Sequence, residues 1–274
     1  MHNNRLTFVV PVNNDHIYNN NFLSSPLLKK NNNIYILKQE FFQSASLAYN
    51  NAIQKSENDI MVFTHQDMVF PVNWEYDLQN SIKYLNNIDP RWGILGCYGK
   101  VEDGHHGKGH GYLYCNGNKK LLGKPFSHPI QVQTLDEVVL IIKKSSGLRF
   151  DNLLPHYHLY GADICMTAET KGMKCYAISA FCLHNTEKIS YLTKEFFECY
   201  NYLKYKWRNK LPIYHSCINL ENNDWKNVII YKYYRKYKHI ITNLFFKNRL
   251  DERVRSDNPI HLLYELENIF KIEL

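Results

Sequence analysis

The sequence predicts an α/β fold whose sheet contains parallel strands. Residues 6–12, Leu-Thr-Phe-Val-Val-Pro-Val, form an apolar, β-branched run typical of a strand buried on both faces. Residues 34–37 and 59–63 have the character of two further strands, and residues 44–55 between them that of a helix with Ser44 as its N-cap. A strand, a helix and a strand within about thirty residues is the unit that builds parallel sheets.

Further elements alternate along the chain in the same way. Those that we expect are a helix over residues 74–85, a strand after Trp92, a buried strand within residues 132–143, a helix from Gly161 to about Lys171 that stops at Gly172, and a strand over residues 175–183. Beyond residue 190 the pattern becomes helical and aromatic. We therefore predict a main domain of residues 1–190 and a helical C-terminal extension of residues 191–274.

Composition indicates a folded chain. Of 274 residues, 45% are apolar and 22% are charged, as in an ordinary globular protein, and this excludes global disorder. The seven cysteines contain no Cys-x-x-Cys pair, so we interpret them as reduced thiols of a cytoplasmic protein. The N-terminal apolar run is shorter than a signal-peptide core, and no stretch approaches the roughly 18 apolar residues of a membrane span.

The net charge of +7 is concentrated in the extension. Residues 191–274 hold 15 Lys and Arg against 10 Asp and Glu, and residues 226–249 hold seven basic residues and no acidic one. At helical spacing this segment separates an apolar stripe from a basic face. The stripe contains Ile230, Tyr234, Tyr237, Ile241, Leu244 and Phe245, and the opposite face contains Lys232, Arg235, Lys236, His239 and Lys247.

Two interpretations of residues 226–249 are open. The helix could lie on an anionic membrane surface with its stripe in the headgroup region. Alternatively, the stripe packs on the main domain and the charges are solvated. Nucleic acid is not an expected partner, because the main domain is nearly neutral and has no recognised RNA or DNA motif.

Polar side chains follow the strand of residues 59–63. His65, Gln66 and Asp67 come directly after it, and ligands of parallel sheets bind at the carboxyl ends of strands. A divalent metal facing a diphosphate needs oxygen ligands, sometimes with a histidine, and Asp67 and His184 could supply them. The alternatives are a turn or N-cap carboxylate for Asp67 and a hydrogen-bonded histidine at a strand end for His184.

Asp163 stands at the start of a predicted helix. The positive end of the helix dipole favours a carboxylate there, so Asp163 could be a capping residue and nothing more. As a functional residue it would take a proton from an attacking hydroxyl.

The order of these features resembles the bacterial family-2-like glycosyltransferases of the GT-A fold, in the variant whose metal motif is His-Gln-Asp where others have Asp-x-Asp. The resemblance covers about residues 6–190. The stretches that carry it are residues 9–13, residues 46–52, residues 62–67, residues 132–143, residues 160–165 followed by Gly172, and Leu183-His184.

The resemblance implies a Rossmann-like mixed sheet flanked by helices, and transfer of a sugar from a nucleotide-diphosphate donor to a hydroxyl of a surface-glycan or lipid-linked acceptor. Asp67 would hold Mn²⁺ or Mg²⁺ with His184 as second ligand, and Asp163 matches the general base of the inverting members. Nucleotide-binding positions would be Pro11, Val12, Asn13, Asn50, His65 and Gln66, and donor-sugar or acceptor positions Asp136, Glu137 and His158.

The chain departs from the family pattern at three places. The second strand ends Lys38-Gln39-Glu40 where many relatives have an acidic pair that holds base and ribose. His65 replaces the first carboxylate of the metal motif, so it could contact phosphate or ribose. Ala162 stands where many relatives have Glu, which leaves Asp163 as the acidic residue of that motif.

Two competing functions remain. The first is a nucleotide-sugar or glycan-binding protein of the same fold without turnover. The second is a zinc hydrolase, with zinc held by His105, His106 and His110 or by His156 and His158. Against zinc, residues 104–111 are so rich in glycine that we expect a mobile loop there, and neither cluster has a Cys or Glu at helical ligand spacing.

Overall fold

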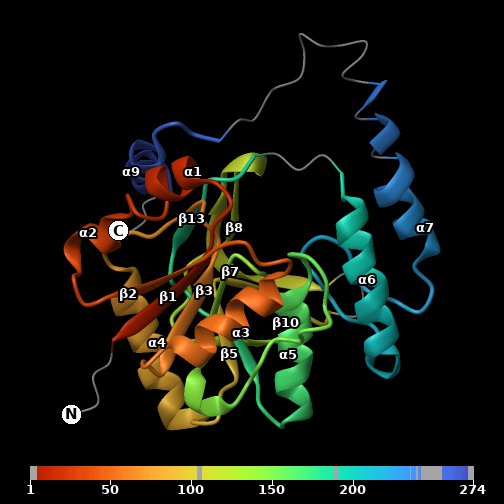
Figure 1. The fold of residues 1–274 in the computed structure, drawn as a ribbon, viewed down its shortest axis with the longest axis horizontal. Coiled ribbons are helices and arrows are strands. Elements are labelled where there is room, and N and C mark those ends of the chain that lie inside the picture. The colour runs from red at the N-terminus through yellow and green to blue at the C-terminus, as the bar shows by residue number, and fades with distance from the viewer. Residues whose placement is uncertain are drawn as a thin grey trace.

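The predicted first strand lies between two neighbouring strands near one edge of a seven-stranded sheet. The computed structural model describes residues 5–103, 107–187, 191–234, 236–238, 240–241 and 255–270 (Figure 1). The strands of this sheet, in spatial order, are β2 (Tyr35–Gln39), β1 (Leu6–Pro11), β3 (Ile60–Thr64), β11 (Val139–Lys143), β5 (Ile94–Gly96), β12 (Cys175–Ala177) and β9 (Ile130–Val132). Strand β1 is parallel to β2 and β3, and β11 is antiparallel to β3 and β5, so the sheet is mixed. The α/β class is confirmed.

A second sheet continues from the first. Its spatial order is β10 (Thr134–Leu135), β6 (Tyr98–Val101), β7 (Lys108–Cys115), β13 (Cys182–His184) and β4 (Met68–Val69), with β8 (Lys120–Gly123) paired to β7. The single strand predicted over residues 175–183 is therefore two short strands in different sheets. Strand β4 pairs antiparallel with β13, which places His184 opposite Met68.

The glycine-rich segment forms part of a strand, so the prediction of a mobile loop over residues 104–111 is wrong for residues 108–111. Strand β7 begins at Lys108 and pairs with β6. A side chain at Gly109 would collide with the Tyr98 hydroxyl, with its Cβ 2.0 Å from that oxygen. The glycine makes room for a cross-strand aromatic ring, which composition alone does not reveal.

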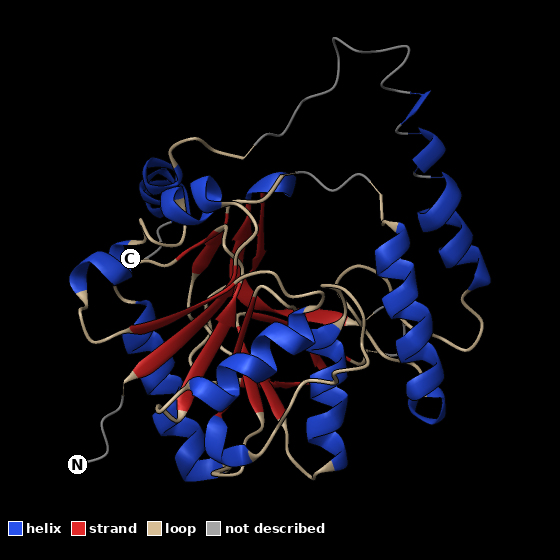
Figure 2. Cartoon of the chain, viewed as in Figure 1, coloured by secondary structure: helices blue, strands red, loops and turns tan. Residues whose placement is uncertain are grey.

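Helices cover both faces of the large sheet (Figure 2). The longer ones are α3 (Ala45–Lys55), α4 (Trp74–Ile88), α5 (Tyr160–Thr170), α6 (Lys194–Lys206) and α9 (Pro259–Phe270). Shorter ones are α1 (Asp15–Asn20), α2 (Pro26–Lys30), α7 (Trp225–Ile229), the π-helical turn η4 (Ile230–Tyr234) and the 3₁₀ turns η1 (Asn116–Asn118), η2 (Lys144–Ser146) and η3 (Arg208–Lys210). Ser44 caps α3 by accepting a hydrogen bond from the Leu47 amide, as predicted.

The strands divide the interior into two cores. Along β3, Met61 and Phe63 point into the core beneath α3 and α5, whereas Val62 points to the opposite side, beneath α4. Alternation of apolar side chains to both faces is what a strand buried on both sides requires. The carboxyl ends of these strands are therefore held in fixed positions, and the residues that follow them are described below.

The core continues past residue 190. Phe196, Tyr200 and Leu203 of α6 are buried in the same core as α3 and α5, and Leu263 and Leu266 of α9 pack with Val69 and Leu183 of the second sheet. The division expected at residue 190 is therefore not a boundary between two cores. Figure 1 shows α6 and α9 on opposite sides of the sheets.

The basic segment after α6 is largely exposed where it is described. Figure 1 shows α7 beside α6, and Val228 packs at the edge of the core. In contrast, Ile230, Tyr237 and Ile241 of the predicted stripe are 44%, 60% and 53% exposed. The remaining stripe and basic-face side chains Tyr234, Leu244, Phe245, Arg235, His239 and Lys247 lie outside the described set. Among the residues that are described, no helix is long and apolar enough to cross a bilayer.

Candidate metal and nucleotide site

The ends of β1, β2 and β3 open on a cavity of about 770 Å³. Of the predicted nucleotide-binding residues, Pro11, Val12, Asn13, His65 and Gln66 line it, as does the predicted metal ligand Asp67. The remaining lining residues are Asn14, Asp15, Glu40, Phe41, Phe42, Tyr49, Tyr157 and Tyr160. The structure thus brings together residues that are far apart in sequence at the carboxyl edge of the sheet, where ligands of such folds bind.

Gln66 joins two of these loops. Its Oε1 accepts hydrogen bonds of 3.1 Å from the amides of Asn13 and Asn14, and its Nε2 donates to Asn13 Oδ1 over 2.6 Å. The loop after β1 is therefore fixed to the loop after β3, and the two form one wall of the cavity.

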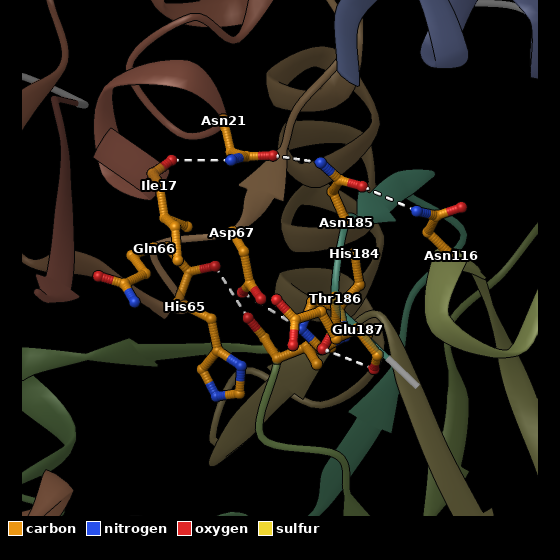
Figure 3. Close-up of polar contacts among 12 residues, drawn as sticks. Ile17, Asn21, His65, Gln66, Asp67, Asn116, His184, Asn185, Thr186 and Glu187 are labelled. Carbon is orange, nitrogen blue, oxygen red and sulfur yellow. Dashed lines mark hydrogen bonds and ion pairs between the residues drawn. The ribbon is translucent and has the colours of Figure 1, made fainter. Parts of the chain in front are cut away.

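His65, Asp67 and His184 form a cluster whose ligand atoms all lie within 4.8 Å of one another (Figure 3). No other group of three or more His, Cys, Asp or Glu side chains in the described part of the chain has this geometry. His65 and Asp67 follow β3, and His184 is brought to them by the pairing of β13 with β4. His184 Nε2 is 3.3 Å from Asp67 Oδ1.

The electrostatics of the cluster favour a charged Asp67. Burial alone would raise the pKa of Asp67, but the neighbouring His184, His65 and Arg255 outweigh it and hold that pKa well below its usual range. Burial would lower the pKa of His184, and Asp67 more than offsets it, raising that pKa to about 10. The carboxylate and this imidazolium are thus an ion pair, and His184 must give up its proton before it can bind a metal.

His65 is in contact with Tyr160. The Tyr160 hydroxyl donates to the Glu137 carbonyl over 3.2 Å and lies 2.9 Å from His65 Nε2. Burial, reinforced by His184, lowers the pKa of His65 to about 4 and keeps the ring neutral.

These three side chains suit a divalent transition ion. One carboxylate and two imidazoles are ligands that divalent transition ions accept, whereas Mg²⁺ prefers ligands that are all oxygen. Asp67 is 8% exposed and borders the cavity, so an ion held there would face a ligand bound in it. The residues present therefore fit a divalent cation.

Asn185 and Arg255 belong to this site although the sequence analysis missed them. Asn185 is fully buried, and its backbone amide donates to the Asp67 carbonyl over 2.9 Å. Its side chain is hydrogen-bonded to the side chains of Asn21 and Asn116 (Figure 3). Arg255 Nη2 is 3.2 Å from Asp67 Oδ2. The signal for Asn185 was its position directly after His184; Arg255 carries no sequence signal.

The structure places Asp163, predicted as the general base, in a buried ion pair. Asp163 is 1% exposed and lies away from the cavity lining. Its carboxylate accepts hydrogen bonds from Lys206 Nζ, at 2.7 and 2.9 Å, and from Trp207 Nε1, at 2.7 Å. Burial raises the pKa of Asp163, with the ion pair to Lys206 opposing it. In this arrangement the carboxylate fastens the end of α6 to α5.

The polar atoms of Asn50, a predicted nucleotide-binding residue, bond to other residues of the chain. Its Nδ2 donates to the Phe150 carbonyl and to Asn152 Oδ1, both over 2.7 Å, and its Oδ1 accepts from the Phe150 amide over 3.0 Å. The side-chain amide is satisfied by the loop after η2. Asn50 therefore positions that loop, and its polar atoms are not directed at a ligand.

Asp136 and Glu137, which were predicted as donor-sugar or acceptor residues, differ in their hydrogen bonding. Asp136 accepts from the Val138 amide and the Ser216 hydroxyl, so it stabilises its own turn. Glu137 lies over the first turn of α5, where a Cβ on Gly161 would come within 3.0 Å of its Cγ. Its Oε1 is buried and has no hydrogen-bond partner among the described residues. Burial, then Asp136, raise the pKa of Glu137 well above its usual range.

The histidines proposed for zinc do not assemble. His156 Nε2 is 2.6 Å from Glu198 Oε2, and the ring of His158 packs on that of Phe196. His110 lies in β7, while His105 and His106 are outside the described residues. Within the described part of the chain, none of the histidines named for zinc belongs to a group of three or more possible metal ligands.

The fold and the cluster define a class: a mixed α/β protein with a metal-competent His-Asp-His site beside a cavity at its strand ends. A family model described as "Glycosyltransferase like family" matches residues 7–205, and the chain belongs to this family. The match extends past residue 190 into α6. The observed sheet, with helices on both faces, agrees with the GT-A fold that the resemblance implied.

More distant similarities were also found. A Fuscovulum blasticum protein named "ATP synthase subunits region ORF 6" is 30% identical over 129 residues, which are 46% of this chain and 50% of that protein. The chain thus matches about half the length of this curated relative. The mannosyltransferase PcManGT from Pyrobaculum calidifontis, in complex with GDP-Man and Mn²⁺, is 16% identical, with 65% of this chain and 56% of that chain covered and a TM-score of 0.38.

TarS from S. aureus is a second solved structure with a distant similarity to this chain. It is 11% identical, the match covers 75% of this chain and 40% of that chain, and the TM-score is 0.46. Both solved structures are too dissimilar to support an argument about ligands.

Proposed function

We propose that this protein is a metal-dependent glycosyltransferase that moves a sugar from a nucleotide-diphosphate donor to an acceptor hydroxyl. The observation that carries the proposal is the cluster of His65, Asp67 and His184 at the edge of the 770 Å³ cavity. Membership of the glycosyltransferase-like family supports it. We favour Mn²⁺ over Mg²⁺ because two of the three ligands are imidazoles.

Different residues of the chain would hold the metal and the nucleotide. A divalent ion held by Asp67 and the two histidines would stabilise the charge that develops on a leaving diphosphate. The loops after β1 and β3, joined by Gln66, would hold the nucleotide. Phe41 supports this placement, since it is 100% exposed at the cavity with a φ of 63°, and an exposed aromatic ring can stack on a base.

Glu137 is the carboxylate that we propose as the general base in place of Asp163. Its Oε1 is buried beside the first turn of α5 without a hydrogen-bond partner among the described residues, and a raised pKa makes a carboxylate a stronger base. A base on the acceptor side supports an inverting course, in which the hydroxyl oxygen attacks the sugar carbon as the bond to diphosphate breaks.

We further propose that the acceptor belongs to a surface glycan or lipid-linked intermediate of polysaccharide biosynthesis, reached from the cytoplasmic side of the membrane. The exposed stripe of Ile230, Tyr237 and Ile241, with Lys232 and Lys236 on the same segment, has the composition of a peripheral membrane contact. This proposal makes the protein cytoplasmic and peripheral at the inner face of the membrane.

A thermal-shift screen tests the proposed donor. We expect one class of nucleotide sugar to raise the melting temperature with Mn²⁺ and not with EDTA, because a ligand that binds only the native state stabilises it. The stabilising donor should then be hydrolysed slowly in a metal-dependent reaction. Binding without turnover would instead support the alternative of a non-catalytic nucleotide-sugar or glycan-binding protein, and the absence of binding would contradict both.

Vesicle flotation tests the membrane contact. We expect the protein to float with vesicles that contain anionic lipid and not with neutral vesicles, and to lose this binding in Tyr237→Ser/Ile241→Ser because the variant removes apolar area from the contact. The matched control is Ile269→Ser, which changes a side chain that is 67% exposed on α9. Equal flotation of all three proteins would contradict the proposed contact.

A further inference from the structure

Arg255 connects the C-terminal segment to the metal cluster. Its Nη2 is 3.2 Å from Asp67 Oδ2, its Nε donates to the Asn185 carbonyl over 2.8 Å, and its Nη1 is 3.7 Å from Glu187 Oε1. The side chain is only 21% exposed. A guanidinium held by three groups is part of the site and not a mobile surface charge.

The segment that carries Arg255 is itself anchored. The Asn185 side chain accepts a hydrogen bond from the Ser256 backbone amide over 2.8 Å and donates one to the Ser256 carbonyl over 2.9 Å. Both backbone groups of Ser256 are thus held by one side-chain amide. Three residues later α9 begins, and its Leu263 and Leu266 are buried against the second sheet. The position of Arg255 is therefore fixed from both the backbone and the following helix.

The two oxygens of Asp67 have different partners. Oδ1 faces His184 and Oδ2 faces Arg255. A divalent cation that binds Oδ2, alone or together with Oδ1, displaces the contact to Arg255. The Asn185 carbonyl and Glu187 would still hold the guanidinium beside the cluster, with donors left unpaired.

A guanidinium placed beside a metal-held diphosphate has a suitable partner. Its planar set of N–H groups matches two phosphate oxygens, and such charge-assisted pairs are among the stronger hydrogen bonds. We propose that Arg255 is a diphosphate-binding residue of the donor site, which pairs with Asp67 in the arrangement seen here and with phosphate oxygens when the donor binds. This inference rests on the proposed function.

Calorimetry with Mn²⁺ and inorganic pyrophosphate tests the inference on the full chain. In Arg255→Gln we expect the affinity for pyrophosphate at saturating Mn²⁺ to fall at least about tenfold. The affinity for Mn²⁺ alone should stay the same or rise, because a competing cation has been removed from Asp67. Arg255→Lys, which keeps the charge without the planar fork, should lose less pyrophosphate affinity.

Arg208→Gln is the matched control, since Arg208 contacts the Tyr205 carbonyl and not the cluster. It should bind both probes as the wild type does. Unchanged pyrophosphate affinity in Arg255→Gln would overturn the inference and leave the proposed function standing. Loss of Mn²⁺ binding together with pyrophosphate binding in both Arg255 variants would show a structural role and also overturn it. A wild-type protein that binds neither probe would overturn the proposed function itself.

Discussion

Asp67→Ala is expected to abolish metal-dependent hydrolysis of the donor, with a loss of about a thousandfold or more in rate. Asp67 is the single carboxylate of the three-residue cluster, and without it the two imidazoles supply no negative charge to a divalent ion. The substitution also leaves Arg255 and His184 without their shared partner. The rate should be measured at saturating donor, alongside direct titration of Mn²⁺.

The control for this variant is Asp59→Ala. Asp59 precedes β3, at the end of the strand opposite His65, and accepts hydrogen bonds from the amide and hydroxyl of Ser145. It should retain Mn²⁺ binding and hydrolysis. Full activity in Asp67→Ala would exclude the cluster as the catalytic metal site.

Glu137→Gln is expected to keep Mn²⁺ and donor binding while lowering the rate of hydrolysis by about 10²- to 10⁴-fold. The amide has nearly the shape of the carboxyl group but cannot take a proton from the attacking water or hydroxyl. The rate constant at saturating donor is the relevant measurement, because binding is not expected to change.

Asp163→Asn provides the comparison. This variant weakens the contact between Asp163 and Lys206, so it should lower the free energy of unfolding by about 1–3 kcal/mol and change the rate at saturating donor by less than about tenfold. A stable Asp163→Asn protein that has lost turnover, beside an active Glu137→Gln protein, would restore Asp163 as the base.

The sequence was sufficient for the elements that follow local rules. Strand β1 is continuous in apolar residues, Ser44 caps α3 with its own side chain, and His65 to Asp67 directly follow a strand. Each of these features depends on neighbours in the chain, so spacing and residue type predict it. The cavity wall could be predicted for the same reason, because parallel strands end at the same edge.

The parts that could not be predicted depend on contacts between distant residues. Nothing near Asp163 in the sequence indicates that Lys206 and Trp207 will enclose its carboxylate, and a helix N-terminus gives the same pattern for a base and for a structural carboxylate. Nothing near Asn50 in the sequence indicates that the loop at Phe150, 100 residues away, accepts a hydrogen bond from its side-chain amide. The glycine-rich strand β7 depends on the Tyr98 ring across from it.

The anchoring of Ser256 by Asn185 has a consequence for how the protein is made. His65, Asp67 and His184 have all been synthesised once His184 is in place, but Ser256 is 71 residues beyond Asn185. At roughly 5–20 residues per second, translation needs several more seconds to reach it. During that interval the nascent chain lacks Arg255, the second cation that contacts Asp67 in the complete chain. A metal ion that reached the cluster in this interval would meet no competition from Arg255 for the carboxylate.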